Sequence, residues 1–228
     1  NTFIEYRFID KSPLENIRKN SNTTECEQFA ELAKSAALQG NTSKAHQYGL
    51  KVYNSIIGNP KQIKAISNIQ SIALALGKLM EGDFFTDNES IKKAVGISYY
   101  FITKSIVQGG NNPYLYVYRF SITWEYNKVF YYLFAHSENK EIDNSPFNIF
   151  GQSMLMAYDH HLQGMQMADM LTEPRIAQLD PALSNIFNEI YSHYSSTPSI
   201  QIINLGREYH KQIYTYLDEK IKNLNFDF

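Results

Sequence analysis

The 228-residue sequence predicts an all-α fold, and three observations support this prediction. Apolar residues recur every three or four positions along most of the chain, which is the spacing of one helix face and not the alternation of a strand. Six of the seven prolines directly follow Ser, Thr, Asn or Asp. These residues cap helix N-termini well, and proline fits the first helical position because its missing N–H has no partner there. Glycines lie in the short connections, where helices commonly end.

The helices are expected to begin at these caps and to end at the glycine-bearing turns. Three segments have the spacing of a capping box: Ser12 to Glu15, Thr24 to Glu27 and Thr86 to Glu89. Connections such as Gly40-Asn41 are so short that the helices on either side are expected to be antiparallel. The only segment that resembles a longer linker is 137–145. We expect helices at about residues 13–20, 24–39, 42–57, 60–81, 87–108, 113–135, 146–171, 174–194 and 198–224.

The segment from Tyr114 to Phe134 has two alternative interpretations. Its first residues are aromatic and β-branched, as in a strand, but the apolar character continues for about twenty residues, which is far beyond a usual strand. A membrane-spanning helix is not expected either, because Arg119, Glu125 and Lys128 interrupt the run. We therefore expect an ordinary helix here and no membrane span.

Composition limits the class of protein. The 21 Lys and Arg residues nearly balance the 23 Asp and Glu residues, for a net charge of −2, so we expect no nucleic-acid partner, which would need a basic surplus. The length and the 43% hydrophobic content suit a single all-helical domain over 1–228.

The single cysteine, Cys26, excludes an intrachain disulfide. That fits a soluble protein of the reducing cytoplasm, and the start at Asn1 leaves a processed, exported form as the alternative.

An internal pattern suggests repeated helical hairpins. Residues 29–61 contain Phe29, then Leu32-Ala33, a turn at Gln39 to Asn41, and Ala45 in the following helix. This pattern resembles the tetratricopeptide repeat, in which small residues lie where two helices cross. Residues 98–113 resemble the second helix and exit turn of another such repeat, with Ser98 and Ser105 at the crossing positions. The resemblance covers residues 24–135, although the segment 82–89 makes one repeat longer than usual, and beyond Ser137 no motif matches.

The resemblance implies a right-handed solenoid of stacked antiparallel hairpins, followed by divergent C-terminal helices over 146–228. Proteins of that family usually bind peptides on the concave face, so we expect a non-catalytic module that binds a protein or peptide segment. The face would include helices 24–39, 60–81 and 113–135. Transferred to this sequence, the concave positions are Glu27, Ala30, Lys34 and Leu38 in the first helix, and Tyr114, Val117, Ser121, Trp124 and Glu125 in the third.

The residues themselves support a contact surface at 113–135 independently of the resemblance. Ten of the residues between Tyr114 and Phe134 are aromatic, and a helix that is apolar nearly all round is normally covered on several sides. Tyrosine keeps a hydroxyl that needs a partner, so a tyrosine-rich helix often borders a groove. Burial in the core is the alternative for any one of these rings.

Five of the six methionines lie within 154–170. We expect them either to fill a core or to contact a partner, which could be a second copy of the chain. In the same stretch, Asp159, His160 and His161 are adjacent, so their side chains diverge by about 100° on a helix and do not converge on a metal. We therefore expect no metal, no cofactor and no catalytic site. The alternatives are a ligand- or signal-sensing domain of a larger regulatory protein, and an enzyme with a site around Asp159 to His161.

The last expected helix, 198–224, is apolar on one side only. Its apolar residues include Ile213, Leu217 and Ile221, and the opposite side carries charged residues such as Lys211 and Asp218. A terminal helix of a stacked array needs a polar outer surface. We therefore expect this helix to cap the array.

Overall fold

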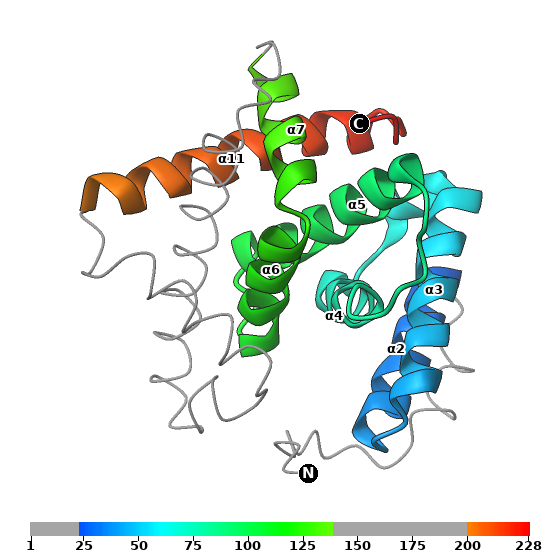
Figure 1. Ribbon diagram of the computed structural model, residues 1–228. Coiled ribbons are helices and arrows are strands. Elements are labelled where there is room, and N and C mark those ends of the chain that lie inside the picture. The colour runs from blue at the N-terminus through cyan, green and yellow to red at the C-terminus, as the bar shows by residue number, and fades with distance from the viewer. Residues whose placement is uncertain (1–22, 139–199) are drawn as a thin grey trace.

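The computed structural model describes residues 23–138 and 200–228, and within these ranges the chain is helical and contains no strand (Figure 1). The all-α prediction is therefore confirmed for the described residues. The expected helices at 13–20, 146–171 and 174–194, and the methionine-rich stretch 154–170, lie outside them. The helices are α2 (Glu25–Leu38), α3 (Thr42–Gly58), the 3-10 helix η1 (Pro60–Ala65), α4 (Ile69–Leu79), α5 (Asn88–Val107), α6 (Pro113–Glu125), α7 (Asn127–Ser137) and α11 (Ile200–Lys222).

Two helical hairpins form the N-terminal part. Helices α2 and α3 pack side by side and are joined by a tight turn, in which Gly40 has a φ of +71° that favours glycine (Figure 1). Helices α4 and α5 also contact each other, with α5 running across α4 in Figure 1, and α4 contacts α2 and α3 as well. The alanines expected at the crossing, Ala33 and Ala45, are buried. Small side chains let the helix axes approach closely.

The helix starts follow the predicted capping chemistry at some positions and not at others. Thr24 and Glu27 form the expected capping box at the start of α2. Asn112 caps α6, where its side chain accepts a 2.9 Å hydrogen bond from the N–H of Tyr114. The predicted box at Thr86 is wrong, because Asp87 is the N-cap of α5 and accepts from the N–H of Ser90 at 2.8 Å. A carboxylate is the stronger acceptor at this position.

The expected helix 60–81 is not continuous. The structure has the 3-10 helix η1, a short break at residues 66–68, and then α4. The backbone N–H groups of Ser67 and Asn68 donate to the carboxylate of Glu27 across the hairpin, both at 2.8 Å, instead of continuing a helix. The side chain of Asn68 then caps α4 by accepting from the N–H of Ser71. A tertiary contact thus ends one helix and begins the next.

The expected helix 113–135 is two helices, α6 and α7, joined at Tyr126. Tyr126 departs from helical geometry with φ −107° and ψ 37°, and its carbonyl accepts from the N–H groups of both Val129 and Phe130. Neither proline nor glycine lies at this joint, so the sequence carries no ordinary signal for a kink. The change of direction brings α7 into contact with α11.

Helix α5 lies at the centre of the described fold. Every residue from Ala94 to Thr103 is buried, because α5 is packed against α4, α6 and α11. Its Gly96 leaves room for the chain end, since a β-carbon there would lie 2.6 Å from the ring of Phe228. A helix that is apolar on all sides is expected to be surrounded in this way.

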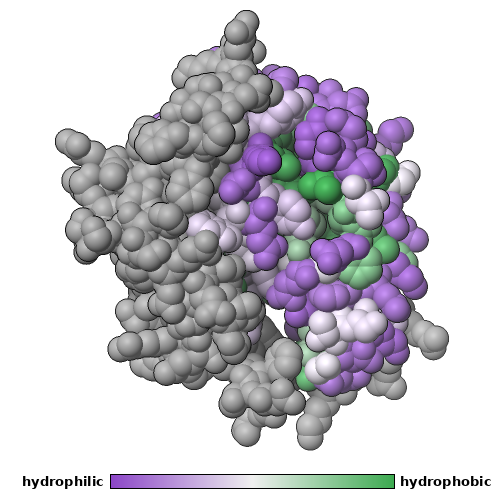
Figure 2. Space-filling model, viewed as in Figure 1, coloured by the Kyte–Doolittle hydropathy of each residue, from purple (hydrophilic) through white to green (hydrophobic). Residues whose placement is uncertain are grey.

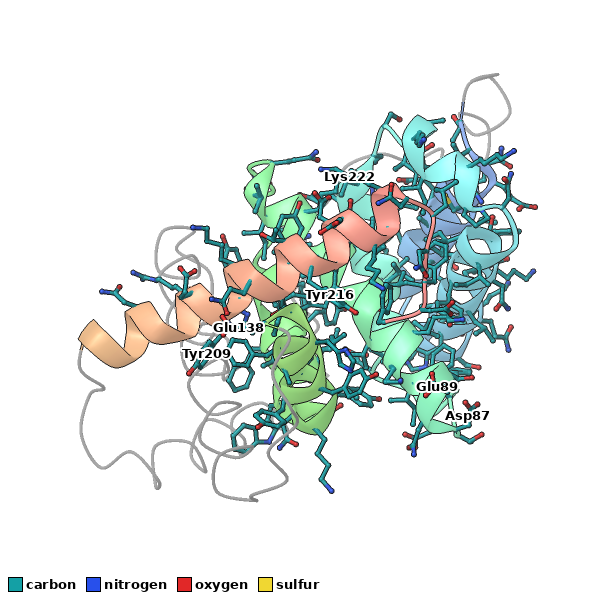
Figure 3. The ribbon with its side chains drawn as sticks, turned by 90° about the horizontal axis from the view of Figure 1, so that it is seen from above. Asp87, Glu89, Glu138, Tyr209, Tyr216 and Lys222 are labelled. Atoms are coloured by element: carbon teal, nitrogen blue, oxygen red, sulfur yellow. The ribbon has the colours of Figure 1, made fainter. Side chains whose placement is uncertain are left out.

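Helix α11 crosses the array and packs on α5 and α7 (Figure 1, Figure 3). Ile213, Leu217 and Ile221 are buried at this contact, as their one-sided spacing predicts. Asp218, expected on the solvent side, instead accepts a 3.0 Å hydrogen bond from the hydroxyl of Tyr100. The hydroxyl of Tyr99 lies 2.6 Å from Nδ1 of His210, so polar as well as apolar contacts hold α11 to α5.

Candidate functional site

The two groups of predicted site residues lie on α2 and α6, and α4 contacts both of these helices. The hydroxyl of Ser71 donates to Glu31 at 2.6 Å and that of Ser67 donates to Glu27 at 2.7 Å, so residues of α2 pair with residues 40 positions later. Helix α6 packs on α4, since a β-carbon on Gly77 would meet the ring of Tyr118. The C-terminal ends of α4 and α6 lie near each other, because the charges of Glu81 and Asp83 act on Glu125.

Glu27 belongs to the interior of this layer and not to its surface. Its side chain is 3% exposed and accepts hydrogen bonds from Thr24, Ser67 and Asn68. Burial alone would raise the pKa of Glu27, but these hydrogen bonds outweigh it and lower the pKa to about 2. The buried carboxylate holds α2 to the start of α4, so its role is structural.

The other predicted residues of α2 divide between interior and surface. Ala30 is buried, which leaves its methyl group out of any open surface. Lys34 is half-buried and forms an ion pair with Glu31 at 3.6 Å. Leu38, at the end of α2, is 52% exposed. Of the four predictions on α2, Lys34 and Leu38 are thus accessible.

Helix α6 presents more of its predicted residues. Tyr114, Ser121 and Trp124 are half-buried, whereas Val117 is buried and belongs to the core. The ring of Tyr114 lies 5.7 Å from that of Tyr118, centroid to centroid. Half-exposed aromatic side chains offer contact area with little conformational freedom to lose.

Glu125 lies at the C-terminal end of α6, near two other carboxylates. Its pKa is raised by partial burial, then by the charges of Glu81 and then Asp83. The ammonium group of Lys78 pairs with Glu81, and Nε2 of His46 lies 3.8 Å from the same carboxylate. Lys78 therefore neutralises only part of the negative charge that gathers at this edge.

The connection between α4 and α5 carries residues for which the sequence pattern predicted no role. Glu81, Asp83 and Phe84 lie here, and Phe84 is 40% exposed and packs its ring edge-on against His46 at 5.7 Å. The extra length of the segment 82–89, relative to the usual repeat, was the available signal. We define the C-terminal edge as Lys78, Glu81, Asp83, Phe84, Trp124 and Glu125.

One face of the molecule shows how apolar and polar residues are distributed on the surface (Figure 2). On the face drawn in Figure 2, hydrophilic residues in purple predominate over the described part, and apolar residues in green lie near its middle. Scattered apolar side chains are ordinary on protein surfaces, so a cluster carries more information than any one residue.

Metal and nucleophile chemistry receive little support from the described ranges. Among residues 23–138 and 200–228, no three His, Cys, Asp or Glu side chains are arranged to hold a metal ion. Burial raises the pKa of the Cys26 thiol, which disfavours the reactive thiolate. Asp159, His160 and His161, the residues of the enzyme alternative, lie outside the described residues.

No family model matches the chain, and no curated protein or solved structure shows significant similarity to it. In the part of the chain that the structure describes, no helix has the length and apolar character to cross a membrane.

Proposed function

We propose that this protein is a non-catalytic binding module that holds a protein or peptide segment against the layer formed by α2, α4 and α6. The tetratricopeptide-like arrangement expected from the sequence is part of this proposal. It is supported by the order of contacts, in which α2 packs on α4 and α4 on α6 while each of the first two is paired with its hairpin partner. Such a layer presents side chains from successive repeats to one extended partner.

One observation carries the proposal. The 40% exposed ring of Phe84 lies beside incompletely neutralised carboxylates at the C-terminal edge, and in this proposal Leu38 of α2, which is 52% exposed, borders the same surface. Trp124 and Glu125 extend the same edge on α6. Apolar groups exposed beside charged groups are typical of protein contact surfaces.

The charge of the C-terminal edge indicates the chemistry of the segment that it would hold. Among the residues that define this edge, the carboxylates of Glu81, Asp83 and Glu125 outnumber the ammonium group of Lys78. A partner segment that carries Lys or Arg beside an aromatic or aliphatic residue complements both features. In this proposal Trp124 and Leu38 provide contact area, and Glu125 orients the partner.

A peptide selection tests the proposal and needs no candidate partner. A random peptide library displayed on phage is selected on the purified full chain, and the enriched peptides are then measured by fluorescence anisotropy. We expect enrichment of sequences in which basic and apolar residues are adjacent. Trp124→Ala should weaken binding of these peptides by tenfold or more, because aromatic anchors dominate interfaces.

Two further variants separate a specific contact from a general charge effect. Glu125→Gln should weaken binding, whereas Glu89→Gln, which removes an exposed carboxylate at the start of α5 (Figure 3), should leave it unchanged. Circular dichroism must show unaltered helicity for each variant. If no peptide is enriched, or if Trp124→Ala and Glu125→Gln bind as the parent does, the proposal fails.

A further inference from the structure

The connection between α4 and α5 runs alongside α3 and packs against His46 (Figure 1). The ring of Phe84 meets that of His46 edge-on, and farther along α3 the rings of Phe85 and Tyr53 meet in the same way at 5.0 Å. A β-carbon on Gly82 would overlap the ring of Phe84 and lie 3.4 Å from Nδ1 of His46. His46 therefore touches the segment that forms much of the C-terminal edge.

One ring nitrogen of His46 faces a carboxylate of this edge without bonding to it. Nε2 of His46 is buried and has no hydrogen-bond partner within the described ranges. It lies 3.8 Å from Oε2 of Glu81, which is too far for a hydrogen bond and close enough for an ion pair. The side chain of His46 is 16% exposed, so the imidazole is in contact with solvent. A proton on this ring would therefore act directly on Glu81.

The nearest charged groups around His46 belong to α4. Glu81 also pairs with the ammonium group of Lys78, one turn earlier on α4. On α3 itself, Lys44 is exposed, and the ammonium group of Lys51 lies over the rings of two neighbouring aromatic residues, 5.3 Å and 5.5 Å from their centres. Glu81 is therefore the only carboxylate within 4 Å of a His46 nitrogen in the part of the chain that the structure describes.

The other elements packed on α3 contribute no charge of this kind. The three glutamates of α2 each accept a hydrogen bond from a serine hydroxyl, and its one lysine lies 3.6 Å from the carboxylate of Glu31. Lys61 and Lys64 of η1 lie at the opposite end of α3, where Gln62 donates to the carbonyl of Ser55. The response of His46 to a proton is therefore directed at the C-terminal edge.

The charge of the edge depends on the protonation of His46. While the imidazole is neutral, the carboxylates of Glu81, Asp83 and Glu125 face the single ammonium group of Lys78, which leaves two negative charges uncompensated. An imidazolium lowers this number to one. The effect reaches Glu125 as well, because the pKa of Glu125 is raised first by burial and then by the charge of Glu81.

We propose that His46 makes binding at the C-terminal edge depend on pH, so that a basic segment is held most tightly when this imidazole is neutral. This inference rests on the proposed function, because it concerns the regulation of the same surface. A histidine changes its charge between about pH 5 and 8, so binding is strongest above this range and weakens as the pH falls through it. The imidazolium competes with the Lys or Arg of the partner for Glu81.

Nuclear magnetic resonance of the full chain without any partner tests the first step. Between pH 8 and 6, the backbone amide signals of Gly82 and Phe84 should shift with the same midpoint as the Cε1–H signal of His46. These shifts should be absent in His46→Phe, which keeps a ring against Phe84 but takes no proton, and in His46→Gln. The control His136→Gln, which removes an exposed histidine on α7, should retain them. Amide shifts that persist in both His46 variants would overturn the proposal.

Fluorescence anisotropy at pH 8 and pH 6 tests the second step, with a selected basic peptide that contains no His, Asp or Glu. The parent and His136→Gln should bind about two- to threefold more weakly at pH 6, as one partly exposed charge accounts for. The His46 variants that retain parental helicity should bind equally at both pH values. If the parent binds equally at pH 8 and pH 6, this proposal fails and the proposed function stands. If no peptide is enriched at all, both fail.

Discussion

Glu27 shows how much one side chain determines at the scale of single residues. Its carboxylate accepts from the backbone N–H and hydroxyl of Thr24, and from the N–H groups of Ser67 and Asn68. It therefore caps its own helix and also fixes the start of α4, about forty residues away. The capping pattern predicts the first of these contacts, and only the folded chain shows the second.

Replacing Glu27 by Gln should destabilise the protein by about 1–3 kcal/mol, because the amide presents one acceptor oxygen and a donor to several N–H and O–H donors. The effect should depend on pH. The pKa of Glu27 is lowered to about 2 from an ordinary value of 4.5, so the carboxylate contributes its full stability above about pH 4.5. That contribution is lost as the pH falls toward 2.

Urea denaturation at pH 7 and at pH 3 provides the measurement. The difference in the free energy of unfolding between the parent and Glu27→Gln should shrink at the lower pH. Glu89→Gln, whose carboxylate is exposed, serves as the matched control and should change stability by less than about 0.5 kcal/mol. The role of Glu27 would be contradicted if the parent and Glu27→Gln had the same free energy of unfolding at pH 7. It would also be contradicted if the difference between them were equal at both pH values.

At the scale of elements, the crossing of α3 over α4 depends on a glycine. A β-carbon on Gly49 would lie 2.8 Å from the carbonyl oxygen of Ala75 and 3.0 Å from Cβ of Leu79. The first of these atoms is backbone, so the two helices would have to separate. Helices α3 and α4 thus pack through backbone-to-backbone proximity as well as through apolar side chains.

The close approach of α3 and α4 predicts whether replacing Gly49 by Ala stabilises or destabilises the protein. Alanine is favoured over glycine inside a helix by up to about 1 kcal/mol, yet Gly49→Ala should destabilise the protein by about 1–3 kcal/mol because of overpacking. Gly58→Ala, at the end of the same helix and with no atom of the described residues near its β-carbon, should be neutral or stabilising. Thermal unfolding followed by circular dichroism compares the two. If Gly49→Ala is as stable as the parent, α3 and α4 do not approach each other this closely.

At the scale of the whole molecule, α11 joins the end of the chain to its centre. Leu217 is fully buried against α5 and α7, and the adjacent Asp218 accepts from Tyr100, more than a hundred residues earlier. Helix α11 and the ring of Phe228 cover a face of α5 that a simple stack of hairpins would leave open. These long-range contacts join α11 to the centre of the described fold.

Leu217→Ala should therefore cost about 2–5 kcal/mol, the usual range for a buried leucine that leaves a cavity. Hydrogen exchange followed by mass spectrometry should show faster exchange in α11 and α5, with α2 and α3 less affected. Lys222→Ala, which removes a largely exposed partner of Asp218, should change stability by no more than about 1 kcal/mol. Unaltered protection of α5 in Leu217→Ala would show that α11 does not stabilise it.

Local signals predicted much of the fold and part of the candidate site. Thr24 and Asn112 cap helices where the sequence places them, and the one-sided apolar spacing of α11 matches its buried face. The break before α4 and the joint at Tyr126 were not predicted, because Glu27 and the packing of α7 on α11 act across long sequence separations. The resemblance implied one concave surface for Trp124, Leu38, Ala30 and Val117, but in the structure Leu38 is exposed and Trp124 half-buried, whereas Ala30 and Val117 are buried.

Caps and apolar periodicity act within a few residues of each other, so the amino-acid order alone predicts that the described chain is helical and where most of its helices begin. Which side chains share a surface depends instead on the packing of distant helices. Glu81, Asp83 and Phe84 lie in a connection whose neighbours are set by the stacking of three helices, and His46 contacts this connection only because α3 packs beside α4. Periodicity within one helix carries no information about the neighbour against which that helix packs.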